Sequence, residues 1–390
     1  MLRELAVSLY LFMFTTFFKL SKLFPLQNKV TFVVSFSENN KSVYKEMLRQ
    51  EFSCRTLFLT TEKMYPLFSK YKDATTLLFE LKKPFDFLRS IFHLATSKVI
   101  VVDNYYGFLS KSAFKPSVEC IQLWHANGAI KKFGLEDPSI ETRNKRAMAR
   151  FKSVYNRFDK VVVGSEAMAD VFKQAFGTSD GKILRSGMPR TDVFFDRSAK
   201  AKAETKLLRQ FPVLKVKKVI LYAPTYRENQ LLDAELRIDL KSLAAQFADE
   251  YVLLLKIHPA VKNKIKIPSE LSHFVYDFSS YHQLNDLLFV TDILITDYSS
   301  IPFEYCLLNR PIIFFLYDLE EYEKERGIWD DYLTFLPGPI AYSSEEVTTI
   351  IKNDQFDLGR IRSFSDKWNQ YSHGESSKNI VCLIKEKLNH

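Results

Sequence analysis

Short apolar runs alternate with longer mixed stretches along most of the chain. The runs of the first half are short and mostly apolar: 29–36, 55–61, 98–104, 119–124 and 160–165. Between them lie stretches of helical length, such as 84–96. Strands that are apolar on both faces and alternate with helices are typical of a parallel sheet covered on both sides. The pattern therefore predicts an α/β fold.

The same alternation starts again in the second half of the chain. Its apolar runs are 218–227, 251–259, 274–280, 292–300 and 311–318. A basic segment at 197–218 with few apolar residues separates the halves, and a helical pattern closes the chain. We therefore expect two doubly wound parallel-sheet domains facing a cleft, at 28–205 and 215–363. The last segment, 364–390, is expected to be helical and to cross back to the first domain.

The N-terminus carries an uncharged, aromatic-rich run from Leu5 to Phe18, closed by Lys19 and Lys22. The run is shorter than the ~20 residues that span a bilayer as a helix, and no small-residue cleavage site follows it. Lysines at the headgroups and apolar side chains in the acyl boundary suit a helix that lies in the membrane interface. We expect 1–27 to be an amphipathic membrane-associating helix; a terminal helix packed on the protein itself is the alternative.

Composition and charge narrow the class of partner. The chain has 390 residues, of which 46% are hydrophobic and 26% charged, as in globular proteins with two domains. The net charge of +9 indicates an anionic partner. Zinc-finger and RNA-binding motifs are absent from the sequence, so we expect an anionic membrane surface and no nucleic acid. Four cysteines without a CxxC pair favour free thiols on the cytosolic side.

Polar side chains gather at the ends of the apolar runs, which is where open parallel sheets bind ligands. These residues are His125, Thr225, Arg227, Lys256, His258, Asp297, Ser299 and Ser300. Histidine suits proton transfer near neutral pH, and arginine suits a bidentate grip on phosphate. Taken singly, each residue has an ordinary alternative, such as a structural histidine or a surface arginine.

The stretch "TDYSSIPFEYCLLN" at 296–309 predicts a strand that turns into a helix at its serines. Pro302 fits the first turn of such a helix. Free N–H groups at the helix start, together with the hydroxyls of Ser299 and Ser300, would bind phosphate. A serine that only caps the helix is the alternative.

Two further sets of residues lie around and after His125. Asn127 and Gly128 suit a tight turn, and Lys131 supplies either a cation for a ligand or a solvated surface charge. A basic run then follows, which includes Arg143, Arg146 and Arg150. Such a run is either a solvated helix face or a surface for anionic lipid and a lipid-linked pyrophosphate.

Several familiar ligand motifs are absent from the sequence. It contains no GxGxxG after the first apolar run, no GxxxxGK[ST], no GxSxG and no HExxH. No DxD pair ends an apolar run, so a metal-bridged nucleotide diphosphate is not expected. We expect no metal and no cofactor, with cations and helix N-termini neutralising any phosphate.

Four stretches, taken in order, carry a family resemblance. They are "LWHANGAIKKFG", "ILYAPTYR", "LLKIHP" and "ILITDYSSIPFEYCLLNRPIIFFLYDLEEYEKERG". They resemble the CDP-glycerol glycerophosphotransferases of wall teichoic acid synthesis. The resemblance extends to "FSDKWNQYSHGESS" at 364–377. The short chain and the "WHANG" loop are most similar to the priming members, because the polymerases are usually longer and carry "WHG" there.

The resemblance implies a GT-B fold, metal-independent transfer and peripheral attachment to the cytoplasmic face of the membrane. Domain 28–205 would take the acceptor, an undecaprenyl-diphosphate-linked ManNAc–GlcNAc, and domain 215–363 would bind the donor, CDP-glycerol. One glycerol phosphate would pass to the ManNAc, and CMP would leave. Other enzymes of teichoic acid synthesis would be possible partners.

Roles follow from the same resemblance. His125 is expected to be the base, and His258 to hold the transferred phosphate or assist protonation, although the two roles could be exchanged. Arg227, Lys256, Ser299 and Ser300 would bind the diphosphate, and Asp297 would order that turn. The rival functions are a poly(glycerol phosphate) polymerase of the same family, a GT-B glycosyltransferase that uses a nucleotide sugar, and a non-catalytic scaffold.

Overall fold

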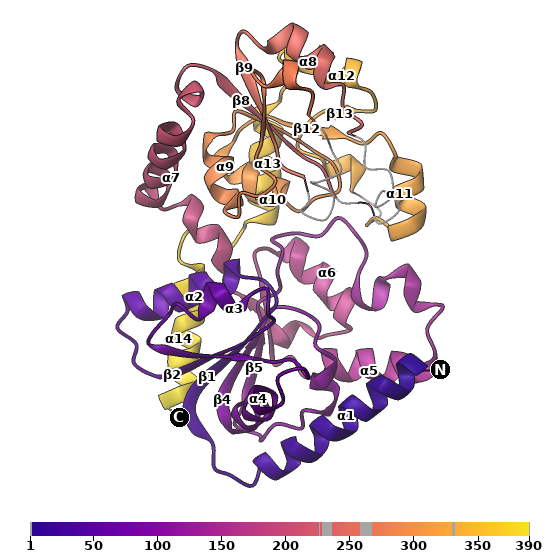
Figure 1. The fold of residues 1–390 in the computed structure, drawn as a ribbon. Coiled ribbons are helices and arrows are strands. Elements are labelled where there is room, and N and C mark those ends of the chain that lie inside the picture. Colours follow the sequence, from indigo (N-terminus) through magenta and orange to yellow (C-terminus); the bar gives the residue numbers. More distant parts are fainter. Residues whose placement is uncertain (1, 226, 228–235, 258–266, 330–331, 390) are drawn as a thin grey trace. The chain divides into compact units, whose positions relative to one another are not determined.

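The structure is a computed structural model that describes residues 2–225, 227, 236–257, 267–329 and 332–389. The chain divides into two compact units, drawn in Figure 1. The first comprises Met1–Asn127, Phe133–Asp192 and Asn369–His390, and the second comprises Gly128–Lys132 and Val193–Trp368. The division at 192–193 falls before the basic segment 197–218. The cleft expected between two domains concerns their relative placement and stays a prediction.

The first unit is built on a parallel sheet of seven strands in the order β3-β2-β1-β4-β5-β6-β7. The strands are β1 Gln27–Val34, β2 Arg55–Thr60, β3 Ala74–Leu78, β4 Ser97–Val102, β5 Glu119–Gln122, β6 Lys160–Val163 and β7 Ile183–Arg185. Val33 of β1 lies between Leu59 of β2 and Val102 of β4. The strand order reverses between β1 and β4, and a doubly wound sheet binds ligands outside the carboxyl ends at such a point.

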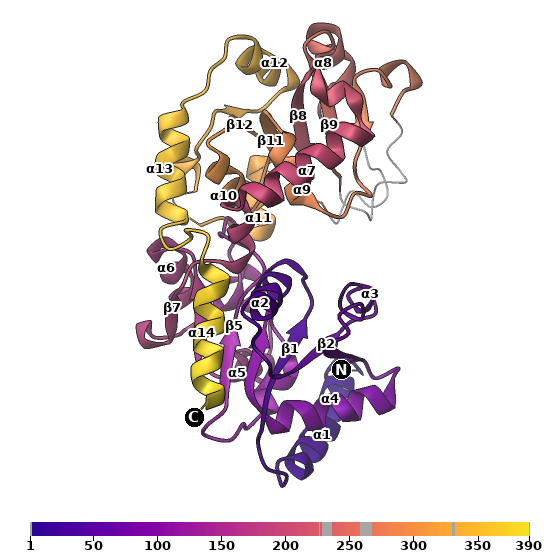
Figure 2. The same cartoon turned by 90° about the vertical axis from the view of Figure 1, so that its left-hand side faces the viewer.

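Helices cover both faces of this sheet. They are α1 Leu2–Ser21, α2 Glu38–Arg49, α3 Tyr65–Phe68, α4 Pro84–Thr96, α5 Lys145–Tyr155, α6 Glu166–Phe176 and α14 Ser376–Asn389. On one face, Val30 and Phe32 of β1 share a core with Val43 of α2 and Ile380 of α14. Figure 2 shows α14, the last helix of the chain, lying along this sheet next to α2. Outside that core, α4 packs on β1, β3 and β4, and α1 packs on α4.

The second unit holds a parallel sheet of six strands in the order β10-β9-β8-β11-β12-β13. The strands are β8 Lys218–Ala223, β9 Tyr251–Leu255, β10 Val275–Asp277, β11 Ile293–Thr296, β12 Ile312–Phe315 and β13 Ile340–Ala341. The helices are α7 Arg197–Gln210, α8 Leu240–Phe247, α9 Leu284–Val290, α10 Pro302–Tyr305, α11 Leu319–Arg326, α12 Ser344–Lys352 and α13 Leu358–Trp368. Alternate strand residues enter two cores, one with α7, α9, α10 and α13 and the other with α8 and α12. Strand order reverses between β8 and β11.

These two parallel sheets confirm the predicted fold class. The apolar runs located the central strands because a strand buried on both faces is apolar at every position. Three strands were missed, β3, β7 and β13, and each lies at the edge of its sheet. Edge strands are covered less completely than central ones, so their sequences lack a continuous apolar run.

The basic segment between the sheets forms α7. Asp196 caps this helix by accepting hydrogen bonds from the backbone N–H groups of Ser198 and Ala199. Ala203 and Leu207 are buried on its inner face, while Lys202 and Lys206 are exposed on the outer face. The sequence showed only a basic segment between the domains, because one helical stripe of apolar residues is difficult to recognise among so many charges.

The N-terminal helix α1 is longer than the uncharged run that suggested it. Its stretch Glu4–Ser21 is long and apolar enough to cross a membrane, by length and composition alone. Three of its side chains are buried in the first unit: Leu11, Phe14 and Phe18. Four others are more than half exposed: Leu5, Leu9, Phe12 and Leu20. The helix therefore packs on the protein with one face and presents a second apolar face to its surroundings.

Candidate active site

His125 lies just after β5, at the carboxyl edge of the first sheet. Its Nδ1 is 3.1 Å from the main-chain carbonyl oxygen of Asp103. A carbonyl oxygen only accepts, so Nδ1 carries the proton and Nε2 keeps a lone pair. Nε2 has no hydrogen-bond partner among the residues that the structure describes. Burial lowers the pKa of His125 to about 4, and the nearby charge of Arg190 acts in the same direction. The imidazole is therefore a neutral base at neutral pH.

The residue before this histidine has an unusual backbone. Trp124 has a φ of 57°, in the left-handed region that a bulky side chain rarely adopts. Its N–H donates to Oε1 of Gln122 at 2.8 Å, and its carbonyl accepts from Nδ2 of Asn39 at 2.9 Å. The indole stacks on Phe133 with ring centroids 4.9 Å apart. The surrounding contacts hold a strained turn, and such strain is concentrated at functional sites.

A buried carboxylate supports the same edge of the sheet. Asp103, at the end of β4, accepts hydrogen bonds from the backbone N–H groups of Ser35 and Phe36 and from Asn40. The hydroxyl of Tyr106 donates to it at 2.6 Å. Burial raises the pKa of Asp103 to about 6, although these four donors favour the charged form. Asp103 thus ties the loop after β1 to the end of β4.

This arrangement gives His125 a stacking partner. The ring of Phe36 lies 4.2 Å from the imidazole, centroid to centroid, with the planes 14° apart. On the backbone side, Nη1 of Arg190 donates to the carbonyl oxygen of His125. Asp103, Phe36 and Arg190 were not among the residues singled out from the sequence. Asp103 is a polar residue near the end of the apolar run at 98–104, and this position is the feature of the sequence that could have identified it.

The loop after His125 leads from the first unit into the second. Asn127 is buried, and its Nδ2 donates to Oδ1 of Asn369 at 2.7 Å, which fastens the loop within the first unit. Gly128 belongs to the second unit, where a Cβ would lie 2.2 Å from the ring of Phe303. Only glycine fits at that distance. Asn127 and Gly128 therefore shape the loop, and their predicted contact with the substrate stays a prediction.

Lys131 lies in the same short segment, Gly128–Lys132, which belongs to the second unit. An antiparallel bridge with Ile328 holds its backbone, and its Nζ lies 5.2 Å from the ring centroid of Tyr322. Burial lowers the pKa of Lys131 to about 8, while the charge of Asp297 opposes that change. The ammonium group makes no ion pair with the residues that the structure describes, so it remains available to an anion.

Arg227 is buried at the carboxyl end of β8, with 5% of its side chain exposed. Its Nε and Nη2 donate to both oxygens of Asp318, at 2.9 and 3.0 Å. Its Nη1 donates to Oδ2 of Asp297 at 2.9 Å. Burial alone would lower the pKa of Arg227, but the hydrogen bonds to Asp318 and the charge of Asp297 raise it. The guanidinium group is therefore a permanent cation whose donors mostly serve these two carboxylates.

Two tyrosine rings lie against this guanidinium group. Its carbon lies 4.8 Å from the ring centroid of Tyr322 and 5.1 Å from that of Tyr298. The two tyrosine rings stack on each other at 3.7 Å. Asp318 and Tyr322 both contact the guanidinium group of Arg227, and neither was singled out from the sequence. They lie on the turn and helix after β12, and only the folded sheet brings that segment next to β8.

Further predicted phosphate ligands lie on the turns after β8 and β11. Asp297 accepts from the backbone N–H of Thr225 at 2.8 Å, so it orders the ends of two adjacent strands. The hydroxyl of Thr225 is buried and has no hydrogen-bond partner in the described part of the chain. Ser299 accepts weakly from the N–H of Ile301 at 3.3 Å. Ser299 and Ser300 are both half-buried.

The expected helix after these serines is confirmed, with Pro302 at its first position. It is short: α10 has four residues and continues as a 3₁₀ turn, Cys306–Leu308. Lys256, at the end of β9, donates to the carbonyl oxygen of Ser279 at 3.1 Å, and burial lowers its pKa. His258 lies outside the described residues. The predicted role of each of these side chains in binding stays a prediction.

The basic run after the His125 loop only partly forms a helix. Arg143 and Arg146 are exposed, and the guanidinium of Arg143 lies 5.0 Å from the ring centroid of Phe151. Arg150 forms an ion pair with Glu4 of α1 at 3.2 Å. That pair joins α5 to the N-terminal helix.

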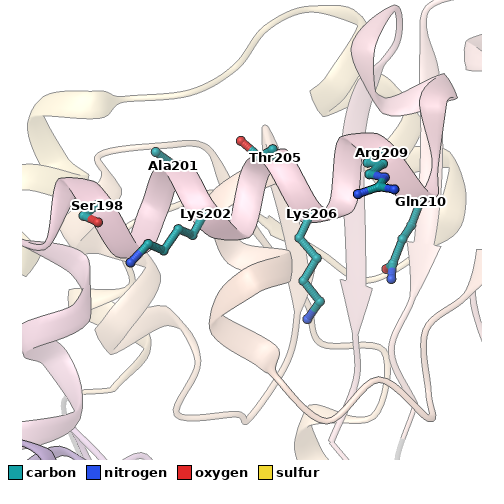
Figure 3. Close-up of a pocket in the computed structure, with 7 residues that line it drawn as sticks. All are labelled: Ser198, Ala201, Lys202, Thr205, Lys206, Arg209 and Gln210. Atoms are coloured by element: carbon teal, nitrogen blue, oxygen red, sulfur yellow. The ribbon is translucent and has the colours of Figure 1, made fainter.

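A hollow of about 660 Å³ lies along the outer face of α7. Figure 3 shows its lining: Ser198, Ala201, Lys202, Thr205, Lys206, Arg209 and Gln210. Nζ of Lys206 already donates to Tyr281 and Asp286. All the residues that line this hollow lie on one face of α7, and they include neither a base nor a buried polar group. We therefore do not assign the reactive site to it. Among the described residues, no group of three His, Cys, Asp or Glu side chains could hold a metal ion.

Known proteins resemble the chain over its whole length. The family described as CDP-Glycerol:Poly(glycerophosphate) glycerophosphotransferase matches residues 15–386. The teichoic acid glycerol-phosphate primase of Bacillus subtilis (strain 168) is 37% identical over 98% of this chain and 98% of its own length. The teichoic acid poly(ribitol-phosphate) polymerase of Bacillus spizizenii is 36% identical over 98% of this chain and 60% of its own.

A solved structure confirms the fold. The wall teichoic acid polymerase TagF covers 100% of this chain, and 98% of that structure is matched, with a TM-score of 0.82 and 24% identity. The fold is therefore GT-B-like, as the resemblance implied. With its family match and its full-length relatives, the chain belongs to the CDP-glycerol:poly(glycerophosphate) glycerophosphotransferases, the transferases of teichoic acid synthesis.

Proposed function

We propose that the protein moves one glycerol phosphate from CDP-glycerol to the ManNAc of an undecaprenyl-diphosphate-linked ManNAc–GlcNAc and releases CMP. The observation that carries the proposal is Nε2 of His125, which has no hydrogen-bond partner among the described residues and is held in the basic tautomer by the carbonyl of Asp103. The similarity to a glycerol-phosphate primase, which is 37% identical over 98% of this chain and 98% of its own length, supports a single addition.

In the proposed reaction, Nε2 of His125 takes the proton of the acceptor hydroxyl. The resulting oxygen attacks the phosphorus that bears glycerol, and the bond from that phosphorus to the bridging oxygen breaks. CMP leaves with the electron pair of the broken bond. A histidine as base contributes about 10²–10⁴-fold to such a step. The pKa of about 4 is that of the free site, and a bound anionic donor would raise it.

The second unit would hold the donor. Lys131 supplies the available cation, and the hydroxyls of Thr225, Ser299 and Ser300 supply donors for the diphosphate oxygens. Arg227 contributes positive potential and fixes the carboxylates of Asp297 and Asp318, rather than gripping phosphate with its whole fork. Lys256 and His258 keep their proposed roles at the diphosphate and at the transferred phosphate, and the two histidines could exchange roles.

The acceptor is a lipid, so the protein would work at the cytoplasmic face of the membrane as a peripheral protein. The exposed apolar face of α1 would enter the acyl boundary, with Lys19 and Lys22 at the headgroups. Arg143 and Arg146, both exposed, would attract anionic lipid or the acceptor pyrophosphate. Arg150 would act through its ion pair to α1.

Mass spectrometry of the lipid-linked acceptor, after incubation with excess CDP-glycerol and protein, tests the proposal. One added glycerol phosphate with an equal amount of CMP is expected. A ladder of additions would identify a polymerase, and release of UDP from a nucleotide sugar would identify a glycosyltransferase. CDP-ribitol serves as a competing donor, because a teichoic acid ribitol-phosphate primase is 33% identical over 95% of the chain.

A further inference from the structure

Phe36 occupies an unusual position for a large apolar side chain. It follows β1 at the point where the strand order of the first sheet reverses, and 40% of it is exposed. A single exposed phenylalanine is ordinary on a protein surface. This one, however, is fixed: Asp103 holds its backbone N–H at 2.8 Å, and His125 stacks on its ring. An exposed ring is thus held rigidly against the imidazole of the proposed base.

A carboxylate lies two residues further along the chain. Glu38 begins α2 and is half-buried, and its Oε1 accepts from the hydroxyl of Ser37 at 2.7 Å. Its Oε2 makes no hydrogen bond to another residue among those described. Burial would raise the pKa of Glu38, but the charge of Arg190 and the hydrogen bond from Ser37 lower it overall. Glu38 is therefore an ionised acceptor with one oxygen to spare.

A rigid aromatic ring and a carboxylate with a spare oxygen suit one chemical class of ligand. A pyranose ring has an apolar face of C–H groups, which pack on the negative face of an aromatic ring. Its rim carries hydroxyl groups, which donate to a carboxylate in charge-assisted hydrogen bonds. An open-chain polyol phosphate has no comparable flat face, and its charge would be repelled by Glu38.

We propose that Phe36 and Glu38 form an acceptor subsite that binds a pyranose ring of the acceptor beside His125. Phe36 would bind the sugar with its outer face while its inner face keeps the imidazole in place. This inference rests on the proposed function, since it names the residues that would recognise a sugar acceptor. It also explains why the loop after β1 is anchored by a buried carboxylate.

Steady-state kinetics with a soluble, short-chain analogue of the disaccharide acceptor test the subsite. In Phe36→Leu, we expect the KM for the acceptor to rise at least tenfold more than the KM for CDP-glycerol. Phe36→Trp, which keeps an aromatic face, should bring the acceptor KM back to within about threefold of wild type. Glu38→Gln should raise the acceptor KM in the same selective way. Phe195→Leu removes a ring that is 44% exposed elsewhere and serves as the control.

The outcomes separate the two proposals. If the wild type transfers glycerol phosphate and Phe36→Leu has an unchanged acceptor KM, the subsite is refuted and the proposed function stands. A loss in kcat with unchanged KM would also refute it, because Phe36 would then only hold the base. Should Phe36→Leu be inactive, equilibrium binding of the acceptor analogue to the folded variant decides, and wild-type affinity overturns the subsite. No transfer by the wild type would refute the proposed function itself.

Discussion

The imidazole Nδ1 of His125 and the main-chain carbonyl oxygen of Asp103 lie 3.1 Å apart, at the ends of two neighbouring strands. This one hydrogen bond decides which nitrogen is free to accept a proton. The carboxyl group of Asp103 meanwhile fixes the loop that carries the ring stacked on the same imidazole. A single residue therefore sets both the tautomer and the orientation of the proposed base.

Stability should depend on pH through Asp103. Its pKa is about 6 in the folded protein against 3.8 as the ordinary value, so the folded state binds its proton more tightly. Its contribution to the free energy of unfolding is fully present below pH 3.8 and is lost as pH rises through about 6. The difference corresponds to roughly 3 kcal/mol as an upper bound.

Asp103→Asn should remove this dependence, as measured by urea unfolding at pH 4 to 7. Wild type should lose stability relative to the variant as pH rises across that window. Asp170→Asn, which removes an exposed carboxylate of α6, is the control and should follow wild type. Parallel curves for wild type and Asp103→Asn would show that the buried carboxyl group is ionised at all these values.

Gly128→Ala should be destabilising because its Cβ would lie 2.2 Å from the ring of Phe303. Overpacking of this kind costs about 1–3 kcal/mol when the neighbours must shift. The loop also carries Lys131, so transfer activity should fall as well. Gly107→Ala is the matched control, since nothing lies within 4 Å of the added Cβ. Equal melting temperatures for the two variants would contradict the close approach.

Arg227→Lys should destabilise the second unit although it keeps the charge. A lysine cannot bond both oxygens of Asp318 and also reach Asp297, so buried carboxylates would lose partners. Breaking a buried ion pair costs roughly 3–5 kcal/mol. Lys218→Ala, which removes an exposed partner of Glu250, should change stability by less than about 1 kcal/mol. Comparable losses of stability in Arg227→Lys and Lys218→Ala would refute the view that Arg227 fixes the carboxylates of Asp297 and Asp318.

The exposed face of α1 should bind membranes. Phe12→Glu changes a side chain that is 71% exposed, so we expect weaker pelleting with anionic phospholipid vesicles and an unchanged melting temperature. Phe14→Ala, on the buried face, should instead lower stability by about 3–5 kcal/mol. Wild-type pelleting by Phe12→Glu, and by a variant that lacks residues 1–24, would rule out this mode of attachment.

The sequence predicted most of the fold and only part of the site. Central strands such as β4 and β11 were evident because burial on both faces leaves an apolar run. His125 and Asp297 were evident because they are polar residues at the ends of such runs. Asp103 acts on His125 only because β4 pairs with β5, and Asp318 reaches Arg227 across 91 residues of chain. Strand pairing of this kind is a property of the folded sheet, and local patterns do not contain it.

Side-by-side conversion of the lipid-linked ManNAc–GlcNAc acceptor by wild type and His125→Ala, with CDP-glycerol in excess, tests the central claim most directly. Wild type should add one glycerol phosphate and release an equal amount of CMP. His125→Ala, with an unchanged melting temperature, should be at least a hundredfold slower, as expected for loss of a general base. Conversion by His125→Ala within a few-fold of the wild-type rate would contradict the assignment of His125 as the base.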